Sequence, residues 1–226
     1  MQRPHMPPAV FMRSFLGMPY RTDGVVNDKN QFATFNEPDK IFTTPGLNCS
    51  GMVLLAAREI LGKKIPIQEA IRDRLGDSAP GSPLGHDWDF GFDFIFNIAE
   101  KEKHILLLPT GAKMPENLTG QTVPGFDPHA ANFTEDMLPR IREDSFYLVS
   151  FSRHKTPNSP AHLHYHTGII VREGEAVWSY STTHNSRKVI RLNLASPEGL
   201  ATFRQSFRNV KNSYKRLTVI EVTPAP

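Results

Sequence analysis

Between Asn48 and Gly62, apolar residues recur at helical spacing from Met52 onward, and a capping residue stands at each end. Asparagine is a favoured N-cap, and glycine is the residue that most often ends a helix. A proline- and threonine-rich stretch comes just before this run. The pattern therefore predicts a helix that begins at Cys49, the only cysteine of the chain.

The remaining pattern predicts helices first and an antiparallel sheet afterwards, which is the α+β order with helices packed on one face of the sheet. Helices are expected at 11–15, 67–75, 90–103, 134–142 with Thr134 as N-cap, and 196–207 with Ser196 as N-cap. Strands are expected at 104–108, 145–151, 164–171, 176–181, 188–192 and 217–222. We expect a polar loop at 22–39 and one domain over 1–226, with an insertion at 63–139.

Composition supports one domain with a substantial core, since 39% of 226 residues are hydrophobic and 22% are charged. The net charge of +3 comes from basic residues that are scattered along the chain, apart from a denser stretch at 204–216. This density is too low for a nucleic-acid footprint, so no nucleic-acid partner is expected. A pI near 9.0 suits work beside an anionic polymer such as a bacterial wall, and equally an ordinary solvated surface.

Location follows only weakly from the sequence. No run of about eighteen apolar residues exists, so no transmembrane helix is expected. The first eighteen residues are too broken by proline and arginine to be a signal peptide. However, His5-Met6 matches the dipeptide that a common cloning site leaves behind, which is compatible with a removed leader. One cysteine allows no disulfide framework and fits reducing and oxidising compartments alike.

Cys49 stands where a helix would favour its thiolate. At the first residue of a helix, unpaired N–H groups and the positive end of the helix dipole lower the pKa of a thiol. The alternative is that a lone cysteine is a small buried hydrophobe. A nearby histidine acting as base would distinguish the two interpretations.

Three of the nine histidines offer such a base or, alternatively, a metal site. His162, His164 and His166 alternate along one predicted strand, so all three are expected on the same face. Three histidines on one face are compatible with zinc. No Glu-x-x-His pair accompanies them, and we expect neither a metal nor another cofactor.

Four motifs, in order, point to a known family. They are Leu16-Gly17-Met18-Pro19-Tyr20-Arg21, Asn48-Cys49-Ser50-Gly51, the strand segment 143–151, and His166-Thr167-Gly168-Ile169-Ile170. In this order and chemistry the chain resembles the NlpC-type cell-wall cysteine peptidases and amidases of the papain-like superfamily. The resemblance covers about half of the chain and leaves 63–139 unexplained.

The resemblance implies a papain-like fold with the nucleophile at a helix N-terminus. Cys49 would be the nucleophile, His166 the general base, and Tyr20 a donor near the oxyanion hole, together with the backbone N–H of Cys49. Where the family has an aspartate that binds a free amine, this chain has Asn48. Trp178 occupies the usual position of the third catalytic residue. His184 is the first candidate substitute for that role, and Asn185 and a backbone carbonyl are the alternatives.

The sequence therefore predicts a cysteine hydrolase that cleaves an amide bond in peptidoglycan stem peptides, as an endopeptidase or an N-acetylmuramoyl-L-alanine amidase. Asn48, Ser50 and Trp178 are the candidate substrate contacts, and muropeptides the expected partners. The alternatives are an inactive wall-binding module and a papain-like acyltransferase or lipid hydrolase. Such substrates imply the cell envelope or secretion, while the sequence is also compatible with the cytoplasm.

Overall fold

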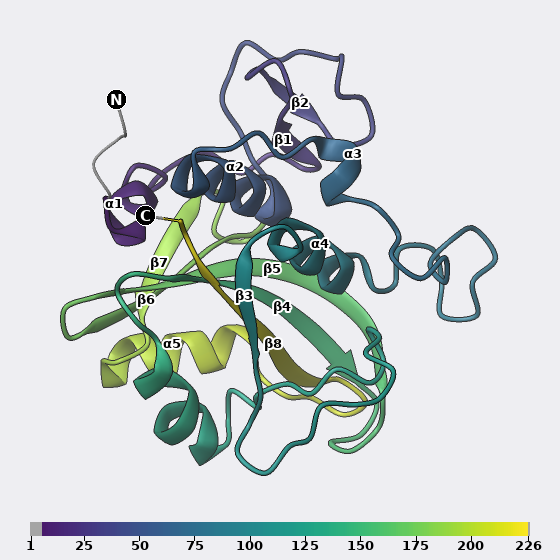
Figure 1. Ribbon diagram of the computed structural model, residues 1–226, viewed down its shortest axis with the longest axis vertical. Coiled ribbons are helices and arrows are strands. Elements are labelled where there is room, and N and C mark those ends of the chain that lie inside the picture. The colour runs from purple at the N-terminus through teal and green to yellow at the C-terminus, as the bar shows by residue number, and fades with distance from the viewer. Residues whose placement is uncertain (1–5, 226) are drawn as a thin grey trace.

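A computed structural model describes residues 6–225, so His5 of the His5-Met6 dipeptide lies outside it. The centre of the molecule is a six-stranded antiparallel sheet in the order β3-β8-β4-β5-β6-β7 (Figure 1). Its strands are β3 (Lys103–Leu107), β4 (Phe146–His154), β5 (Ala161–Glu173), β6 (Ala176–Thr182), β7 (Val189–Asn193) and β8 (Tyr214–Thr223).

Helices cover both faces of this sheet rather than one (Figure 1). On one face lie α2 (Cys49–Leu61) and α4 (Phe90–Ala99), which contact β5, and on the other lies α5 (Pro197–Ser206), which contacts β7. Beside α2 are α1 (Pro8–Arg13) and a small hairpin of β1 (Gly24–Val26) and β2 (Phe32–Thr34). The α+β class is confirmed, and the expectation that helices cover a single face is wrong.

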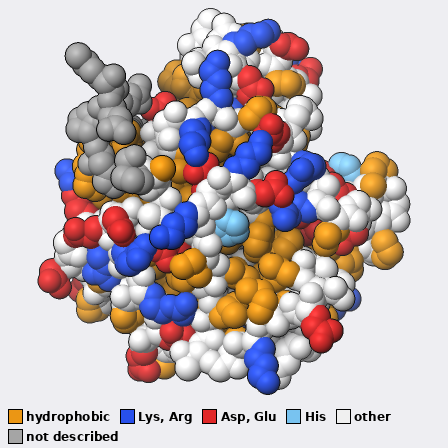
Figure 2. All heavy atoms as spheres, viewed as in Figure 1, with side chains coloured by type: hydrophobic (Ala, Val, Ile, Leu, Met, Phe, Trp, Pro, Cys, Tyr) orange, Lys and Arg blue, Asp and Glu red, His pale blue; other side chains and the backbone are white. Residues whose placement is uncertain are grey.

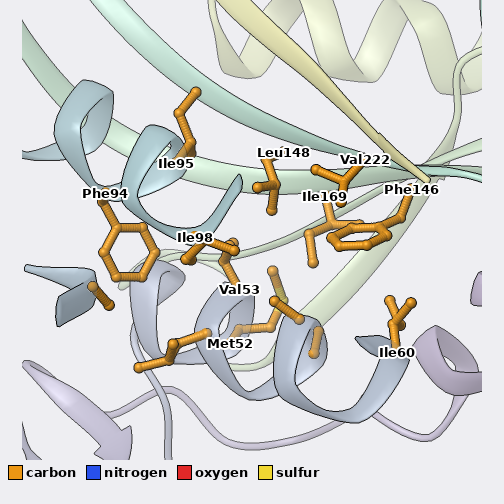
Figure 3. Packing of buried hydrophobic residues seen from close by; sticks show 14 of the residues in the cluster. Met52, Val53, Ile60, Phe94, Ile95, Ile98, Phe146, Leu148, Ile169 and Val222 are labelled. Atoms are coloured by element: carbon orange, nitrogen blue, oxygen red, sulfur yellow. The ribbon is translucent and has the colours of Figure 1, made fainter. Parts of the chain in front are cut away.

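Two apolar layers follow from the alternation of side chains along the strands. Figure 3 shows the layer between α2, α4 and the sheet, where Met52 and Val53 meet Phe94, Leu148 and Ile169. The opposite layer lies between the sheet and α5. It is formed by the alternate residues of the same strands together with Phe203 of α5, and includes Tyr147, Val149, Phe151, Ile170 and Leu217. Because both layers are apolar, the central strands read as nearly continuous hydrophobic runs.

The helix at Cys49 is confirmed with both caps. The Asn48 side chain accepts a hydrogen bond from the N–H of Gly51 at 2.7 Å, and Gly62 ends the helix with a φ of 62°. The Ser196 cap is also confirmed, because its side chain accepts from the N–H of Gly199. Local capping chemistry therefore defines both helix starts.

Several predicted helices differ in extent or type; α4, for example, ends at Ala99 rather than at residue 103. α3 spans only Ile67–Ala70, because the carboxylate of Asp73 accepts the N–H groups of Leu75 and Gly76 and holds the chain in a turn. In place of a helix at 134–142 there is a π-helical turn, η1 (Phe133–Met137), followed by a 3₁₀ turn, η2 (Leu138–Arg140). Pro139 lacks an N–H for a regular helix, and the hydroxyl of Thr134 donates to Ala131 instead of capping.

The segment 63–139, expected as an insertion, contributes to both central layers. Within it, α4 packs on β4 and β5, and β3 pairs with β8 as an edge strand of the sheet. The short α1 is shifted toward the N-terminus relative to the predicted helix at 11–15, because a proline at its first position favours a helix start there. The polar loop expected at 22–39 contains the β1–β2 hairpin.

Charges of both signs are interspersed on the face shown in Figure 2, and hydrophobic side chains gather near its centre. Many of the charged residues are paired, as in the contact of Lys63 with Glu102 at 2.7 Å. Within residues 6–225 no helix has the length and apolar character needed to cross a bilayer.

Candidate active site

The nucleophile candidate is held at the start of α2 by a close backbone contact. A Cβ at Gly51 would lie 2.0 Å from the carbonyl oxygen of Gly24, so only glycine lets this first helical turn approach β1 so closely. The N–H of Asn48 donates to the same Gly24 carbonyl at 2.9 Å. Cys49 is thereby fixed between the β1 strand and the sheet, and it is partly exposed.

The base candidate lies at an open stretch of strand edge. β6 pairs with β5 only from Ile169 onward, so His166 and Thr167 face no β6 residue. Cys49 lies beside this stretch. Burial by itself would raise the pKa of the Cys49 thiol, but the charge of His166, a hydrogen bond with its ring, and hydrogen bonds with the backbone and hydroxyl of Thr167 outweigh burial and lower the pKa to about 6.

A thiol with a pKa near 6 is largely a thiolate at neutral pH, as a cysteine nucleophile requires. The structure therefore brings together Cys49 and His166, which are 117 residues apart in the sequence. It also shows that Thr167, which the sequence analysis did not single out, contacts the sulfur and helps to lower its pKa. In the sequence, Thr167 stands out only because it directly follows His166. Consecutive strand residues face opposite sides of the sheet, so Thr167 points toward the side where α2 packs.

Ser50 links the helix to the same strand. Its hydroxyl lies 3.2 Å from the hydroxyl of Thr167, and both side chains are buried. Ser50 is thus a clamp between α2 and β5 beside the sulfur, in a position sheltered from solvent. Asn48, the other predicted substrate contact next to Cys49, is half-buried and uses its side-chain oxygen to cap α2.

His166 is surrounded by aromatic rings rather than by a third polar residue. Its ring centroid lies 5.1 Å from that of Phe151 and 5.7 Å from that of Phe207. Its Nε2 is buried and has no hydrogen-bond partner among residues 6–225. Apart from the hydrogen bond with Cys49, packing therefore holds the ring in orientation.

The two other predicted catalytic residues lie together. Tyr20 is joined to the segment before the nucleophile, since it bridges Leu47 and its N–H donates to the Arg187 carbonyl at 2.8 Å. His184 is exposed and stacks edge-on against Tyr20, with ring centroids 6.1 Å apart. His184 makes no hydrogen bond to His166 within the described part of the chain, so the structure does not bring it to the Nε2 atom.

Trp178 lies away from this cluster. It pairs with Val171, five residues further along β5 than His166, and its ring is covered by the guanidinium of Arg191 at 3.9 Å. Its distance along the strand follows from the length of the β5–β6 hairpin. The structure thus separates Trp178 from the cysteine and histidine pair.

The expectation that the three alternating histidines share a face is wrong. A β-bulge interrupts the β4–β5 register, because Phe151 pairs with His166 while Ser152 pairs with His164, which leaves Tyr165 as an extra residue. His164 therefore faces α4, where its ring lies 5.7 Å from that of Phe92, whereas His166 faces Phe207 at the end of α5.

A second irregularity in β5 leaves His162 unpaired with β4, so the three rings do not converge. His164 is also fully used, since its Nδ1 lies 2.9 Å from the Ser150 hydroxyl and its Nε2 2.8 Å from the Gly120 carbonyl oxygen. Nowhere in residues 6–225 do three metal-binding side chains gather in a group suited to an ion. The zinc alternative has no geometric basis.

Gly168, in the motif that begins at His166, lies where β5 meets β6. A Cβ there would lie 3.0 Å from the Tyr180 carbonyl and 3.6 Å from the ring of Phe151. This glycine thus serves the packing of β6 and of the aromatic cluster around His166.

A cavity of about 530 Å³ lies at the opposite end of α2 from Cys49, around Asn27, Arg58 and Gly62. The Arg58 guanidinium there already donates to the carbonyls of Val26 and Ile65 and pairs with Asp28. Because none of the candidate site residues lines it, this cavity is separate from the candidate active site.

Comparison with known proteins reveals likeness in fold but not in sequence. No family model matches the chain, and no curated protein matches its sequence. Protein LPG0564 from Legionella pneumophila, a structure labelled with the family model DUF1460, is 12% identical, with a TM-score of 0.56 over 96% of this chain and 88% of that one. An N-acetylmuramoyl-L-alanine amidase from Bacteroides uniformis is 14% identical, with a TM-score of 0.49 over 96% and 97% of the two chains. At such identities the LPG0564 likeness shows a shared fold and leaves the chemistry to the site itself.

Proposed function

We propose that this protein is a papain-like cysteine hydrolase that cleaves an amide bond in peptidoglycan stem peptides through an acyl-enzyme on Cys49. The observation that carries the proposal is the lowered pKa of a thiol at a helix start, where contacts with His166 and Thr167 outweigh burial. The four ordered motifs supply the substrate class. The solved amidase from B. uniformis supplies a reaction to test and not evidence for it.

In the proposed reaction the Cys49 thiolate attacks the carbonyl carbon and the imidazolium of His166 gives a proton to the departing amine. Water, deprotonated by the now neutral His166, then attacks the thioester and releases the carboxylic acid and the thiolate. The backbone N–H of Cys49 forms no hydrogen bond with the described residues, so it is free to donate to the oxyanion. Tyr20 is the second proposed donor.

The catalytic unit we propose is a dyad of Cys49 and His166. A third residue normally fixes the histidine tautomer, and here the packing of Phe151 and Phe207 around the ring takes over its orientation. His184, beside Tyr20 and open to solvent, is better placed to meet substrate than to orient His166. Such substrates place the protein in the cell envelope or outside the cell.

Cys49→Ala tests the proposal directly. Deleting the covalent nucleophile should lower the hydrolysis of purified muropeptides by at least about 10³-fold, because the remaining site binds but cannot form the acyl-enzyme. Mass spectrometry of the products identifies the bond. The circular dichroism spectrum should not change, since one sulfur is removed from a helix start. Wall degradation by Cys49→Ala at the wild-type rate would refute the proposal, and an inactive wild-type protein that binds muropeptides would favour a binding module.

Asn48→Asp addresses which amide is cleaved. If an acid at this position captures a free amine, the substitution should improve the turnover of peptides that begin with free L-Ala, relative to intact muropeptides, by about tenfold or more. Aspartate also caps helices, so α2 should keep its start. An unchanged preference would mean that Asn48 acts only as the cap.

A further inference from the structure

A group of basic side chains around one tyrosine lies next to the proposed active site on the α5 side of the sheet. Arg153 on β4 and Lys215 on β8 are directly opposite each other in register. The Arg153 guanidinium lies 4.3 Å from the centroid of Tyr165, and the Lys215 ammonium lies 5.5 Å from the same ring. We call Arg153, His162, Tyr165 and Lys215 the basic cluster.

Like charges directly opposite on neighbouring strands destabilise a sheet. Lys215 is nevertheless only 8% exposed, and its ammonium is satisfied by the carbonyl and hydroxyl of Ser213, which are neutral. No carboxylate in residues 6–225 forms an ion pair with Arg153 or Lys215, although the neighbouring Arg216 pairs with Asp127 at 2.7 Å. The repulsion between Arg153 and Lys215 is therefore not offset by an acidic residue, whereas the charge of the neighbouring Arg216 is.

Two nitrogen atoms in the basic cluster also lack partners. Nε of Arg153 and Nδ1 of His162 are buried, and neither forms a hydrogen bond within the described part of the chain. Protonation of His162 and Lys215 is disfavoured first by burial and then by the surrounding positive charge. Burial comes first and the charges of Lys155, Arg153 and Lys215 next in lowering the pKa of His162, and burial followed by Arg153 lowers the pKa of Lys215.

The basic cluster is continuous with the proposed catalytic residues. Tyr165 is the extra residue of the β-bulge, and its ring centroid lies 6.4 Å from that of His166. A single aromatic ring therefore separates the Arg153 guanidinium from the imidazole. A substrate bound at Cys49 and His166 would thus lie next to the basic cluster.

We propose that Arg153 and Lys215, together with His162, form a subsite for a free carboxylate of the stem peptide, on the side of His166 away from α2. The assignment rests on the proposed function for its substrate class. A planar guanidinium held flat on a tyrosine presents its edge to a carboxylate in a fixed geometry, which suits two-point recognition. An anion there would also relieve the repulsion between the two opposed cations.

The test measures binding separately from turnover. In the Cys49→Ala background, calorimetry with an acidic stem peptide and with the same peptide converted to its carboxamide should show at least about tenfold tighter binding of the acid, as a charge-assisted hydrogen bond would give. Arg153→Gln should remove this preference. Arg191→Gln, which removes another guanidinium stacked on an aromatic ring but far from the site, should preserve it.

Thermal stability distinguishes a binding role of Arg153 from a purely structural one. Because Arg153→Gln removes one of two opposed like charges, the melting temperature should stay equal or rise while the acid preference is lost. Lys215→Gln gives a second, independent loss of preference. Equal binding of acid and carboxamide by the parent protein, or a preference that survives both substitutions, would overturn the subsite. Inorganic phosphate binding more tightly than the acidic peptide would overturn the carboxylate assignment.

The outcomes separate this inference from the proposed function. If acid-selective binding is present and depends on Arg153, but wild-type protein hydrolyses nothing, the subsite stands and the hydrolase proposal fails. If hydrolysis depends on Cys49 but ignores the carboxylate, the hydrolase proposal stands and the subsite fails.

Discussion

The two sides of β5 carry histidines of opposite character only two positions apart. On the α4 side, His164 is 2% exposed and both ring nitrogens have polar partners, Ser150 and Gly120. On the α5 side, His166 has a buried Nε2 that finds no hydrogen-bond partner among residues 6–225, and it lies beside the cysteine. A fully hydrogen-bonded histidine stabilises structure, whereas one left incompletely bonded next to a thiol is available for proton transfer.

The largest expected effect comes from His166→Ala. Without the imidazolium, the pKa of Cys49 should rise from about 6 toward or above the ordinary value of about 8.5. At pH 6 the rate of alkylation by iodoacetamide should then fall by about 10²-fold, in proportion to the thiolate fraction. His162→Ala serves as the control and should alkylate nearly like wild type, and equal losses in the two variants would contradict the assignment of His166.

His164→Ala should affect stability instead. It leaves the Gly120 carbonyl and the Ser150 hydroxyl without their partner and opens a space beside Phe92, which together should lower the free energy of unfolding by about 2–4 kcal/mol. Chemical denaturation measures this loss. Thiol alkylation of the folded variant at pH 6 should remain nearly unchanged, and a loss as large as that of His166→Ala would show that the two histidines do not have separate roles.

The pH dependence of stability sharpens the same contrast. The pKa of His164 is lowered to about 4, first by burial and further by the charge of His154, against the opposing hydrogen bond to Gly120. Between about pH 6.5 and pH 4, His164 is therefore protonated in the unfolded chain but not in the folded protein. The contribution of neutral His164 to the free energy of unfolding is complete above about pH 6.5. It is lost as the pH falls toward about 4, by up to about 3 kcal/mol.

Two buried carboxyls near His164 titrate in the opposite sense. Burial, with the charges of Asp93 and Asp77, raises the pKa of Asp89 to about 7, and burial raises that of Asp93 to about 6. Their contribution is lost as the pH rises through these values. The melting temperatures of wild type and His164→Gln should thus be measured from pH 4 to 7. The carboxyl contributions cancel in the difference between the two proteins. Parallel curves would exclude His164 as the titrating group.

The smallest expected effect concerns the clamp between the helix and the strand. Ser50→Ala and Thr167→Val each remove one hydroxyl of a buried pair 3.2 Å apart, and a double-mutant cycle should give a coupling free energy of about 1 kcal/mol. Only Thr167→Val should also raise the pKa of Cys49, because hydrogen bonds with Thr167 help to lower it, whereas the Ser50 hydroxyl lies 3.9 Å from the sulfur and is not among the causes. Additive effects of the two substitutions would mean that the hydroxyls do not interact.

The sequence by itself determined the features that depend on neighbouring residues. Asn48 and Gly62 set the start and end of α2, and with them the place of Cys49, because caps act within one helical turn. Alternation and β-branched residues likewise revealed the strands from β4 to β8. The hairpin of β1 and β2 was missed, since three-residue strands carry too short a pattern to stand out from a polar loop.

Only the tertiary structure decided which way each histidine faces. Strict alternation puts His164 and His166 on one face, but the N–H of His164 donates to the carbonyl of Trp88 at 2.7 Å and its ring to Gly120, and these loop contacts accompany the bulge at Tyr165. A bulge depends on partners far away in the sequence, so no local pattern announces it. Contacts between distant parts of the sequence also bring His166 to Cys49 and place Arg153 opposite Lys215. The electrostatic interactions of these residues therefore depend on the tertiary structure.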